Sequence, residues 1–172
     1  MIGTGPGILS RQWIPEGDAG VARTVATMRE LIRVSSLDPS VREAAEEAVA
    51  YLPHDQSAEA DAILDWILGR VDYRPDPEHS EWLQEPAWLI ARIQAGGRPQ
   101  ADCDDLTLLA LSMLSSIGFV TEIHVVATQP DLVYDHVLGL VEINGRQEAL
   151  DLTLGFSGGP PAPEYRAATV AV

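Results

Sequence analysis

Residues 101–118 read ADCDDLTLLALSMLSSIG and include Cys103, the only cysteine in the chain. The apolar residues of this stretch recur at the spacing i, i+3, i+4 and i+7, which is typical of one face of an α-helix. They are Leu106, Leu109, Ala110, Met113, Leu114 and Ile117. Because Leu108 and Leu111 make a second flank apolar, we expect a helix that is buried on most sides and ends at Gly118.

The start of this expected helix favours a reactive cysteine. Asp102 is the natural N-cap, which places Cys103 in the first turn. There, unpaired backbone N–H groups and the positive end of the helix dipole stabilise a thiolate, so we expect the thiol pKa to be lowered. The carboxylates of Asp102, Asp104 and Asp105 act against this shift. Cys103 is therefore a candidate nucleophile that needs a base, and an inert buried thiol is the alternative.

A β-hairpin further along the chain supplies a candidate base. Residues 135–153 read DHVLGLVEINGRQEALDLT, in which Asn-Gly at 144–145 is typical of a two-residue type I′ turn. That turn sets a register in which Leu138 faces Asp151. Strand side chains alternate, so His136 shares the face of Leu138 and lies diagonally across from Asp151. The two backbones are then about 7 Å apart, within reach of a contact between the imidazole and the carboxylate.

Cys103, His136 and Asp151 form the order nucleophile, base and orienting acid. This order, with the segment ILDWILGRVDYRPDPEHSEWLQEPAWLIARIQAGGRPQADCDD at 63–105, resembles the transglutaminase-like superfamily of papain-like cysteine enzymes. The small bacterial and phage-encoded members are the most similar, over roughly residues 57–155. The resemblance implies an α+β fold in which N-terminal helices precede a cysteine-bearing helix packed on an antiparallel sheet.

The resemblance also implies an activity. A cysteine-dependent acyl transfer at amide bonds is expected, as in a protease or amidase, with a peptide or amide substrate and no cofactor. Backbone N–H groups near Cys103 and Asp104 would hold the oxyanion. The alternative is a non-catalytic structural or interaction component of a phage particle or tail, with protein partners in that assembly. The three aspartates at 102, 104 and 105 with His136 match no calcium loop and offer too few His or Cys ligands for zinc, so we expect no metal.

The composition excludes several classes of partner. A net charge of −15 argues against nucleic acid and anionic membranes, whose binding needs basic patches. A single cysteine excludes an intrachain disulfide. The first residues, MIGTGPGILSRQW, lack the pattern of a signal peptide, and no apolar run approaches the roughly 18 residues of a membrane span. We therefore expect a cytoplasmic protein, or a virion component if the chain is phage-encoded.

The remaining pattern predicts one domain. Residues 1–17 are rich in Gly and Pro and predict an irregular arm, followed by a single domain over 18–172. Expected helices before the cysteine helix are 19–35, 39–52, one from Ser57 and one from Pro86. Expected strands are 71–74, 119–127, 135–143, 146–153 and 164–171. Helices first and antiparallel strands last indicate an α+β protein. His124 is expected to be structural, and His54 and His79 are expected to lie in loops.

Overall fold

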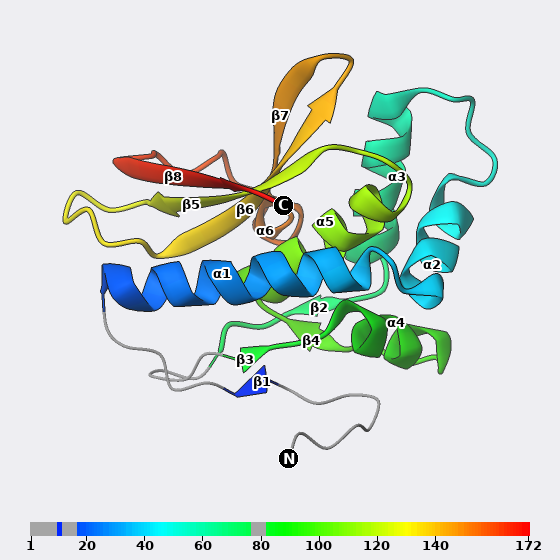
Figure 1. The fold of residues 1–172 in the computed structure, drawn as a ribbon, viewed down its shortest axis with the longest axis horizontal. Helices are drawn as coiled ribbons and strands as arrows, with labels where there is room; N and C mark the ends of the chain where they lie inside the picture. The colour runs from blue at the N-terminus through cyan, green and yellow to red at the C-terminus, as the bar shows by residue number, and fades with distance from the viewer. Residues whose placement is uncertain (1–9, 12–16, 77–81) are drawn as a thin grey trace.

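The computed structural model describes residues 10–11, 17–76 and 82–172 (Figure 1). Most of the expected arm at 1–17, and His79, lie outside these residues. The helices are α1 (Asp18–Ser35), α2 (Pro39–Val49), α3 (Gln56–Leu68), α4 (Pro86–Gln94), α5 (Cys103–Ser116) and α6 (Thr153–Ser157). The strands are β1 (Ser10–Arg11), β2 (Asp72–Tyr73), β3 (Trp82–Leu83), β4 (Gln100–Ala101), β5 (Thr121–Ala127), β6 (His136–Ile143), β7 (Arg146–Leu150) and β8 (Arg166–Ala171). The predicted α+β fold is confirmed.

Three of the helices begin at an aspartate whose side chain caps the first turn. Asp38 accepts a hydrogen bond from the backbone N–H of Ser40 at 2.8 Å, with Pro39 as the first helical residue. Asp55 caps α3 in the same way, and Asp102 caps α5. An aspartate at this position satisfies backbone N–H groups that have no partner inside the helix. The predicted starts of the second helix and of the cysteine helix are therefore confirmed.

The main sheet has four antiparallel strands in the order β7-β6-β5-β8. Its hairpin turn has positive φ at both Asn144 (52°) and Gly145 (76°), as a type I′ turn requires. Gly139 pairs with Leu150, which is the register that the Asn-Gly turn predicts. The C-terminal strand predicted over 164–171 is also present, as β8.

The second strand of the hairpin is shorter than predicted. It ends at Leu150, and the short helix α6 begins at Thr153. The cause lies in Asp151, whose Oδ1 accepts hydrogen bonds from the backbone N–H of Thr153 at 3.0 Å and from its hydroxyl at 2.6 Å. An aspartate that bonds the backbone two residues ahead favours a turn over an extended chain. The strand predicted over 146–153 is therefore wrong in its last three residues.

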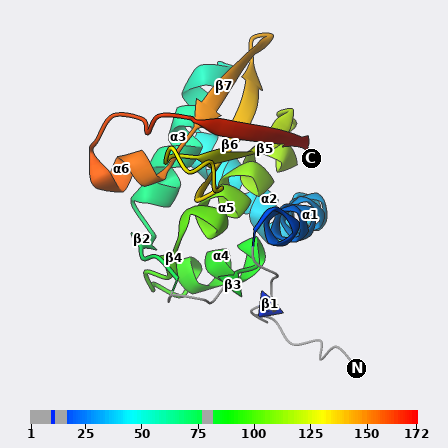
Figure 2. The same ribbon diagram turned by 90° about the vertical axis from the view of Figure 1, so that its left-hand side faces the viewer.

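Helix α5 forms the centre of the molecule. Figures 1 and 2 show it between the four-stranded sheet on one side and α4 with the short strands on the other. It contacts α1, α2, α3 and α4 as well as β5 and β6. Every residue from Asp104 to Leu114 is buried. Since a fully buried leucine contributes about 1.5–3 kcal/mol, this helix anchors the core and holds Cys103 in a fixed place. In the described part of the chain, no helix is both long and apolar enough to cross a bilayer.

The distance between α5 and the strand that carries His136 depends on one glycine. A Cβ built on Gly139 would lie 2.6 Å from Cδ2 of Leu111, a side chain that is fully buried. Gly139→Ala should therefore lower the free energy of unfolding by about 1–3 kcal/mol, as overpacked cores do. Urea denaturation measures this effect. Gly159→Ala is the control, because a Cβ there meets only the Ser157 hydroxyl at 3.9 Å. Equal stability of both variants would contradict the close approach of α5 to β6.

Candidate active site

Cys103 is the first residue of α5 and lies where the sequence predicts it. Asp102 accepts hydrogen bonds from the backbone N–H groups of Asp104 and Asp105, both at 3.1 Å. The Cys103 side chain is partly buried and lines a cleft of about 390 Å³ that His136 also lines. The structure therefore brings the candidate nucleophile and the candidate base to one cavity.

His136 and Asp151 are in direct contact. Nε2 of His136 lies 2.9 Å from Oδ2 of Asp151, and the two side chains are only 16% and 14% exposed. Because the other carboxylate oxygen is held by Thr153, the orientation of Asp151 is fixed on both sides. The prediction that His136 and Asp151 lie on one face of the hairpin is confirmed.

The charge of Asp151 is stabilised by these contacts. Burial by itself would raise the pKa of this carboxyl group. The hydrogen bonds from His136 and Thr153 outweigh burial and lower the pKa of Asp151 below its ordinary value. Asp151 is therefore an ionised carboxylate at neutral pH, as an acid that orients a histidine must be.

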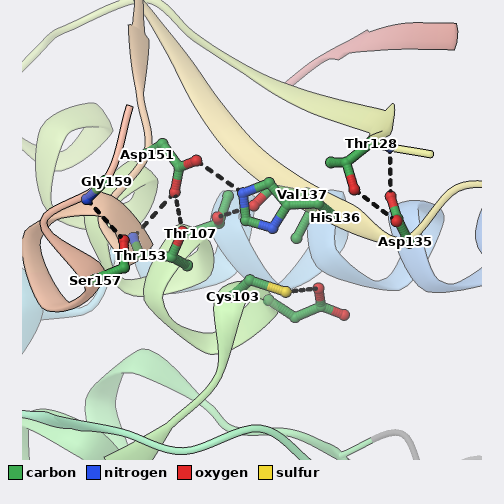
Figure 3. Close-up of polar contacts among 11 residues, drawn as sticks. Cys103, Thr107, Thr128, Asp135, His136, Val137, Asp151, Thr153, Ser157 and Gly159 are labelled. Carbon is green, nitrogen blue, oxygen red and sulfur yellow. Dashed lines mark hydrogen bonds and ion pairs between the residues drawn. The ribbon is translucent and has the colours of Figure 1, made fainter. Parts of the chain in front are cut away.

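The sulfur of Cys103 has a different immediate partner from the one expected. Its thiol donates a hydrogen bond to Oδ1 of Asp104 at 3.5 Å. Figure 3 shows the second nitrogen of the His136 ring, Nδ1, turned away from Asp151 and toward the side of Cys103.

The expected lowering of the Cys103 pKa is wrong for this arrangement. Burial raises the pKa of the thiol, and the negative charges of Asp104 and Asp102 raise it further. A hydrogen bond from the backbone of Val137 opposes these effects but is weaker. The expectation was based on the helix dipole and did not include the burial of the thiol, which is the largest cause of the shift. The thiol is therefore neutral at rest.

The thiol titration can be measured directly, because the chain has no other cysteine. The alkylation rate of Cys103 with iodoacetamide should rise with pH around a midpoint above about 8.5, the ordinary value for cysteine. Asp104→Asn should lower this midpoint, since it removes the negative charge nearest the sulfur. Asp61→Asn, an exposed site on α3, is the control of equal charge change. A parent midpoint below 7, or one that Asp104→Asn leaves unchanged, would contradict this electrostatic description.

The expected oxyanion donors need one correction. The backbone N–H of Asp104 donates to the cap residue Asp102, so it is not directed at a substrate. That engagement follows from the cap itself, because an N-cap side chain bonds the second or third residue of its helix. The backbone N–H of Cys103 remains as the candidate from the original pair.

Several residues of the cleft were missed by the sequence reasoning. Helix α1 supplies one wall of the cleft, with Val21, Thr24, Val25 and Met28. The segment after β2 supplies a second wall with Asp76, next to Tyr73 of β2 itself. Strands β5 and β6 and the loop between them supply the third, with Val125, Tyr134, Asp135 and Val137. No local pattern connects α1 to Cys103, so only the packing of α1 against α5 reveals this wall.

Tyr73 stacks on Phe156 with ring centroids 5.7 Å apart. Burial raises the pKa of Tyr73 and the nearby carboxylates raise it further, which keeps its hydroxyl protonated.

Asp105 has a supporting role next to the cleft. It is 1% exposed and accepts hydrogen bonds from the backbone N–H of Gln84 at 2.7 Å and from the Gln84 amide. Burial raises its pKa to about 6. These contacts attach the segment after β3 to the first turn of α5, and they help to hold Cys103 in position.

The other histidines lie away from this cleft, as far as the structure describes them. Nδ1 of His124 lies 2.8 Å from the hydroxyl of Thr169, across the β5–β8 pair. His54 is fully exposed. Within residues 10–11, 17–76 and 82–172, no group of three His, Cys, Asp or Glu side chains is arranged to hold a metal ion.

Comparison with known proteins supports the fold. No protein-family model matches this chain, and no curated protein sequence matches it. A candidate protease from Parabacteroides distasonis has a similar structure, with a TM-score of 0.56 and 12% identity over 86% of this chain. A candidate cysteine protease from Cytophaga hutchinsonii aligns over 76% of this chain with a TM-score of 0.46 and 16% identity.

The first likeness places the chain in the α+β fold of a candidate protease, and at 12% identity it concerns the fold alone. This chain spans 36% of the Parabacteroides distasonis protein and 39% of the Cytophaga hutchinsonii protein. The chemistry of this chain therefore depends on the site residues described above.

Proposed function

We propose that this protein is a cysteine-dependent hydrolase of amide bonds, a protease or amidase of the transglutaminase-like type. The contact between His136 and Asp151, on the cleft that also contains Cys103, carries this proposal. A histidine fixed by a carboxylate on one nitrogen, with its other nitrogen toward a cysteine at a helix start, is the arrangement that thiol acyl transfer needs.

The first half of the reaction is proton removal and attack. Asp151 accepts a hydrogen bond from Nε2–H of His136, so the proton of the neutral ring stays on Nε2 and the lone pair of Nδ1 is available as a base. When substrate binds, the Cys103 thiol turns from Asp104 to Nδ1 and transfers its proton there, while the sulfur forms a bond to the amide carbon. The backbone N–H of Cys103 stabilises the oxyanion. Asp151 stabilises the imidazolium that forms.

The second half returns the site to its starting state. The imidazolium of His136 gives its proton to the leaving nitrogen as the C–N bond breaks, which leaves a thioester on Cys103. His136 then removes a proton from water, which attacks the thioester carbon. The C–S bond breaks, the carboxylic acid leaves, and the thiolate takes back the proton from His136.

The shape of the cleft favours an extended substrate. A second hollow of about 490 Å³ shares Val21, Val25, Val125 and Tyr134 with the first and continues between α1 and β8. A small amide would fill only one of the two, whereas a peptide chain would occupy both. The proposed substrate is therefore a polypeptide.

A non-catalytic role is the second candidate, as a component of a protein assembly such as a phage particle. One observation favours it: the Cys103 thiol is neutral and donates to Asp104 instead of being paired as an ion with His136. A site that has lost its chemistry would have these properties.

The hydrolase and the non-catalytic component can be distinguished by the new N-termini that a hydrolase creates in other proteins. A mixture of unmodified proteins is incubated with the parent chain or with Cys103→Ala, and the new N-termini are identified by mass spectrometry. A hydrolase should produce termini that are present with the parent and missing with the variant. Identical termini in both samples would overturn the proposal and favour the structural role.

A further inference from the structure

Strand β8 is a free edge of the main sheet. Within the described residues it pairs with β5 alone, in the sheet order β7-β6-β5-β8. Every residue of β8 except Val170 is exposed. An edge strand of this kind presents backbone N–H and C=O groups with which another extended chain can form hydrogen bonds.

The register of the sheet shows which backbone groups of β8 point outward. The N–H of Val172 donates to the carbonyl of Thr121 at 3.3 Å, and hydrogen-bonded residues alternate along an antiparallel pair. Ala168 and Val170 therefore bond to β5. The residues that alternate with them point their N–H and C=O groups away from the sheet; these are Ala167, Thr169 and Ala171. In the part of the chain that the structure describes, none of these three makes a backbone hydrogen bond outside the sheet.

The sequence of this edge does not protect it from pairing. From Ala167 to Ala171 the strand reads AATVA, without a charged residue or a proline, which are the residues that usually protect an edge. The opposite edge of the sheet, β7, reads RQEAL and carries two charged residues. The side chains of β8 are also small, so another chain can approach its backbone. Strand β8 is therefore the edge of this sheet that is open to strand addition.

The hollow beside this edge continues into the cleft that contains Cys103. It has a volume of about 490 Å³ and lies between α1 and β8, where Ala168 and Val170 line it. Val21, Val25, Val125 and Tyr134 line both hollows. A chain that leaves the cleft along these shared residues therefore reaches β8.

The pairing of the strands gives the length of that path. Val126 pairs with His136 on one side and with Ala167 on the other, so the three residues form one row across the sheet. A strand added to β8 would lie three strand spacings from His136, about 14 Å, which an extended chain spans in about four residues. A substrate bound at His136 would therefore meet the edge about four residues from the reacting bond.

We propose that an extended segment of the polypeptide substrate, about four or more residues from the amide bond that is cleaved, pairs its main chain with the free edge of β8. This inference deepens the proposed function and rests on it. A second copy of this chain is the other possible occupant, but two molecules with a net charge of −15 each would repel one another. Main-chain pairing depends little on sequence, so unfolded polypeptides should bind in preference to folded ones.

Amide hydrogen exchange followed by NMR tests the pairing at single residues. The probe is dephosphorylated β-casein, an unstructured polypeptide, added to Cys103→Ala so that it is bound without being cleaved. In the free protein, the N–H groups of Ala167, Thr169 and Ala171 should exchange at least about tenfold faster than those of Ala168 and Val170. Saturating casein should slow the exchange of the three outward groups about tenfold or more.

Two results of this experiment would overturn the inference. One is unchanged exchange at the three outward groups when casein is bound. The other is slow exchange at these groups before casein is added, because the edge would then already be covered. If that slow exchange becomes faster on dilution, in parallel with dissociation of a dimer in sedimentation, the occupant of the edge is a second copy of this chain.

Proline variants test whether the pairing contributes to catalysis. Proline lacks the N–H group, and at an outward position of an edge strand it leaves the pairing with the neighbouring strand intact. Ala167→Pro removes one outward N–H from β8. Ala149→Pro is the matched control on β7, because the residues next to the Asn-Gly turn are a hydrogen-bonded pair and alternation then directs the N–H of Ala149 outward.

The readout divides two rates measured on the same protein. The kcat/KM for a long peptide around a mapped cleavage site is divided by the acylation rate of Cys103 with the p-nitrophenyl ester of an N-acylglycine, which is too small to reach β8. Ala167→Pro should lower this ratio about three- to tenfold, as the loss of one hydrogen bond does, and Ala149→Pro should leave it within about twofold. An equal ratio in the two variants would overturn the inference.

Failure of this inference can be distinguished from failure of the proposed function. New N-termini that depend on Cys103, with no protection of β8 by casein, would overturn the strand addition and leave the hydrolase intact. Protection of β8 by casein, with no new N-termini that depend on Cys103, would overturn the hydrolase and leave β8 as an edge that binds polypeptides.

Discussion

Replacing Cys103 by alanine should abolish amide hydrolysis, with a fall in kcat of about 10³-fold or more. The sulfur is the atom that forms the bond to the substrate, and no other cysteine can replace it. The fold should survive, because Asp102 still caps α5 and the lost side chain is small and only partly buried. Initial rates on a peptide identified by terminus mapping measure the first effect, and thermal unfolding followed by circular dichroism measures the second.

A matched variant on the same helix makes this result specific. Ser112→Ala removes a hydroxyl of similar size to the thiol, from a fully buried position further along α5. Its activity should stay within about twofold of the parent, because it does not touch the cleft. Hydrolysis by Cys103→Ala at a comparable rate would assign the reaction to another group and would refute the proposed nucleophile.

Asp151→Asn should lower kcat by about 10²- to 10⁴-fold with little change in KM. The asparagine amide can donate to Nε2 of His136, which would place the ring proton on Nδ1. That nitrogen could then no longer accept the Cys103 proton. His136→Ala should have an equal or larger effect, because it removes the base itself. Steady-state kinetics of both variants on one peptide check these expectations.

Two further substitutions serve as controls for this carboxylate. Thr153→Ala removes the hydroxyl that holds the far oxygen of Asp151 and should slow the reaction only about tenfold, because the backbone N–H of residue 153 still holds that oxygen. Glu148→Gln, an exposed carboxylate on β7, should have no effect. If Asp151→Asn were as active as Glu148→Gln, the contact between His136 and Asp151 would be structural only.

The parts of this fold that could be predicted from sequence are those set by local chemistry. The Asn-Gly turn at 144–145 has few possible conformations, and its type determines the register of β6 on β7. That register brings His136 next to Asp151. The period of the leucines in 103–116 likewise predicted a helix buried on most sides.

The parts that could not be predicted depend on packing between distant segments. The wall that α1 contributes to the cleft lies about eighty positions before Cys103 in the printed sequence and carries no motif. The direction of the thiol pKa depends on how deeply the first turn of α5 is buried, which a helix pattern does not reveal. The early end of β7 follows from a side-chain contact of Asp151 with Thr153 that competes with the strand.

The reaction of a neutral activated ester tests most directly whether His136 activates Cys103. The parent and His136→Ala are mixed with the p-nitrophenyl ester of an N-acylglycine, which carries no charge. We predict a burst of p-nitrophenol close to one equivalent per protein, with the acyl mass mapped to Cys103, and a burst at least about 10²-fold slower in His136→Ala. Equal rates in the two proteins, or an acyl group on any other residue, would contradict the activation of Cys103 by His136.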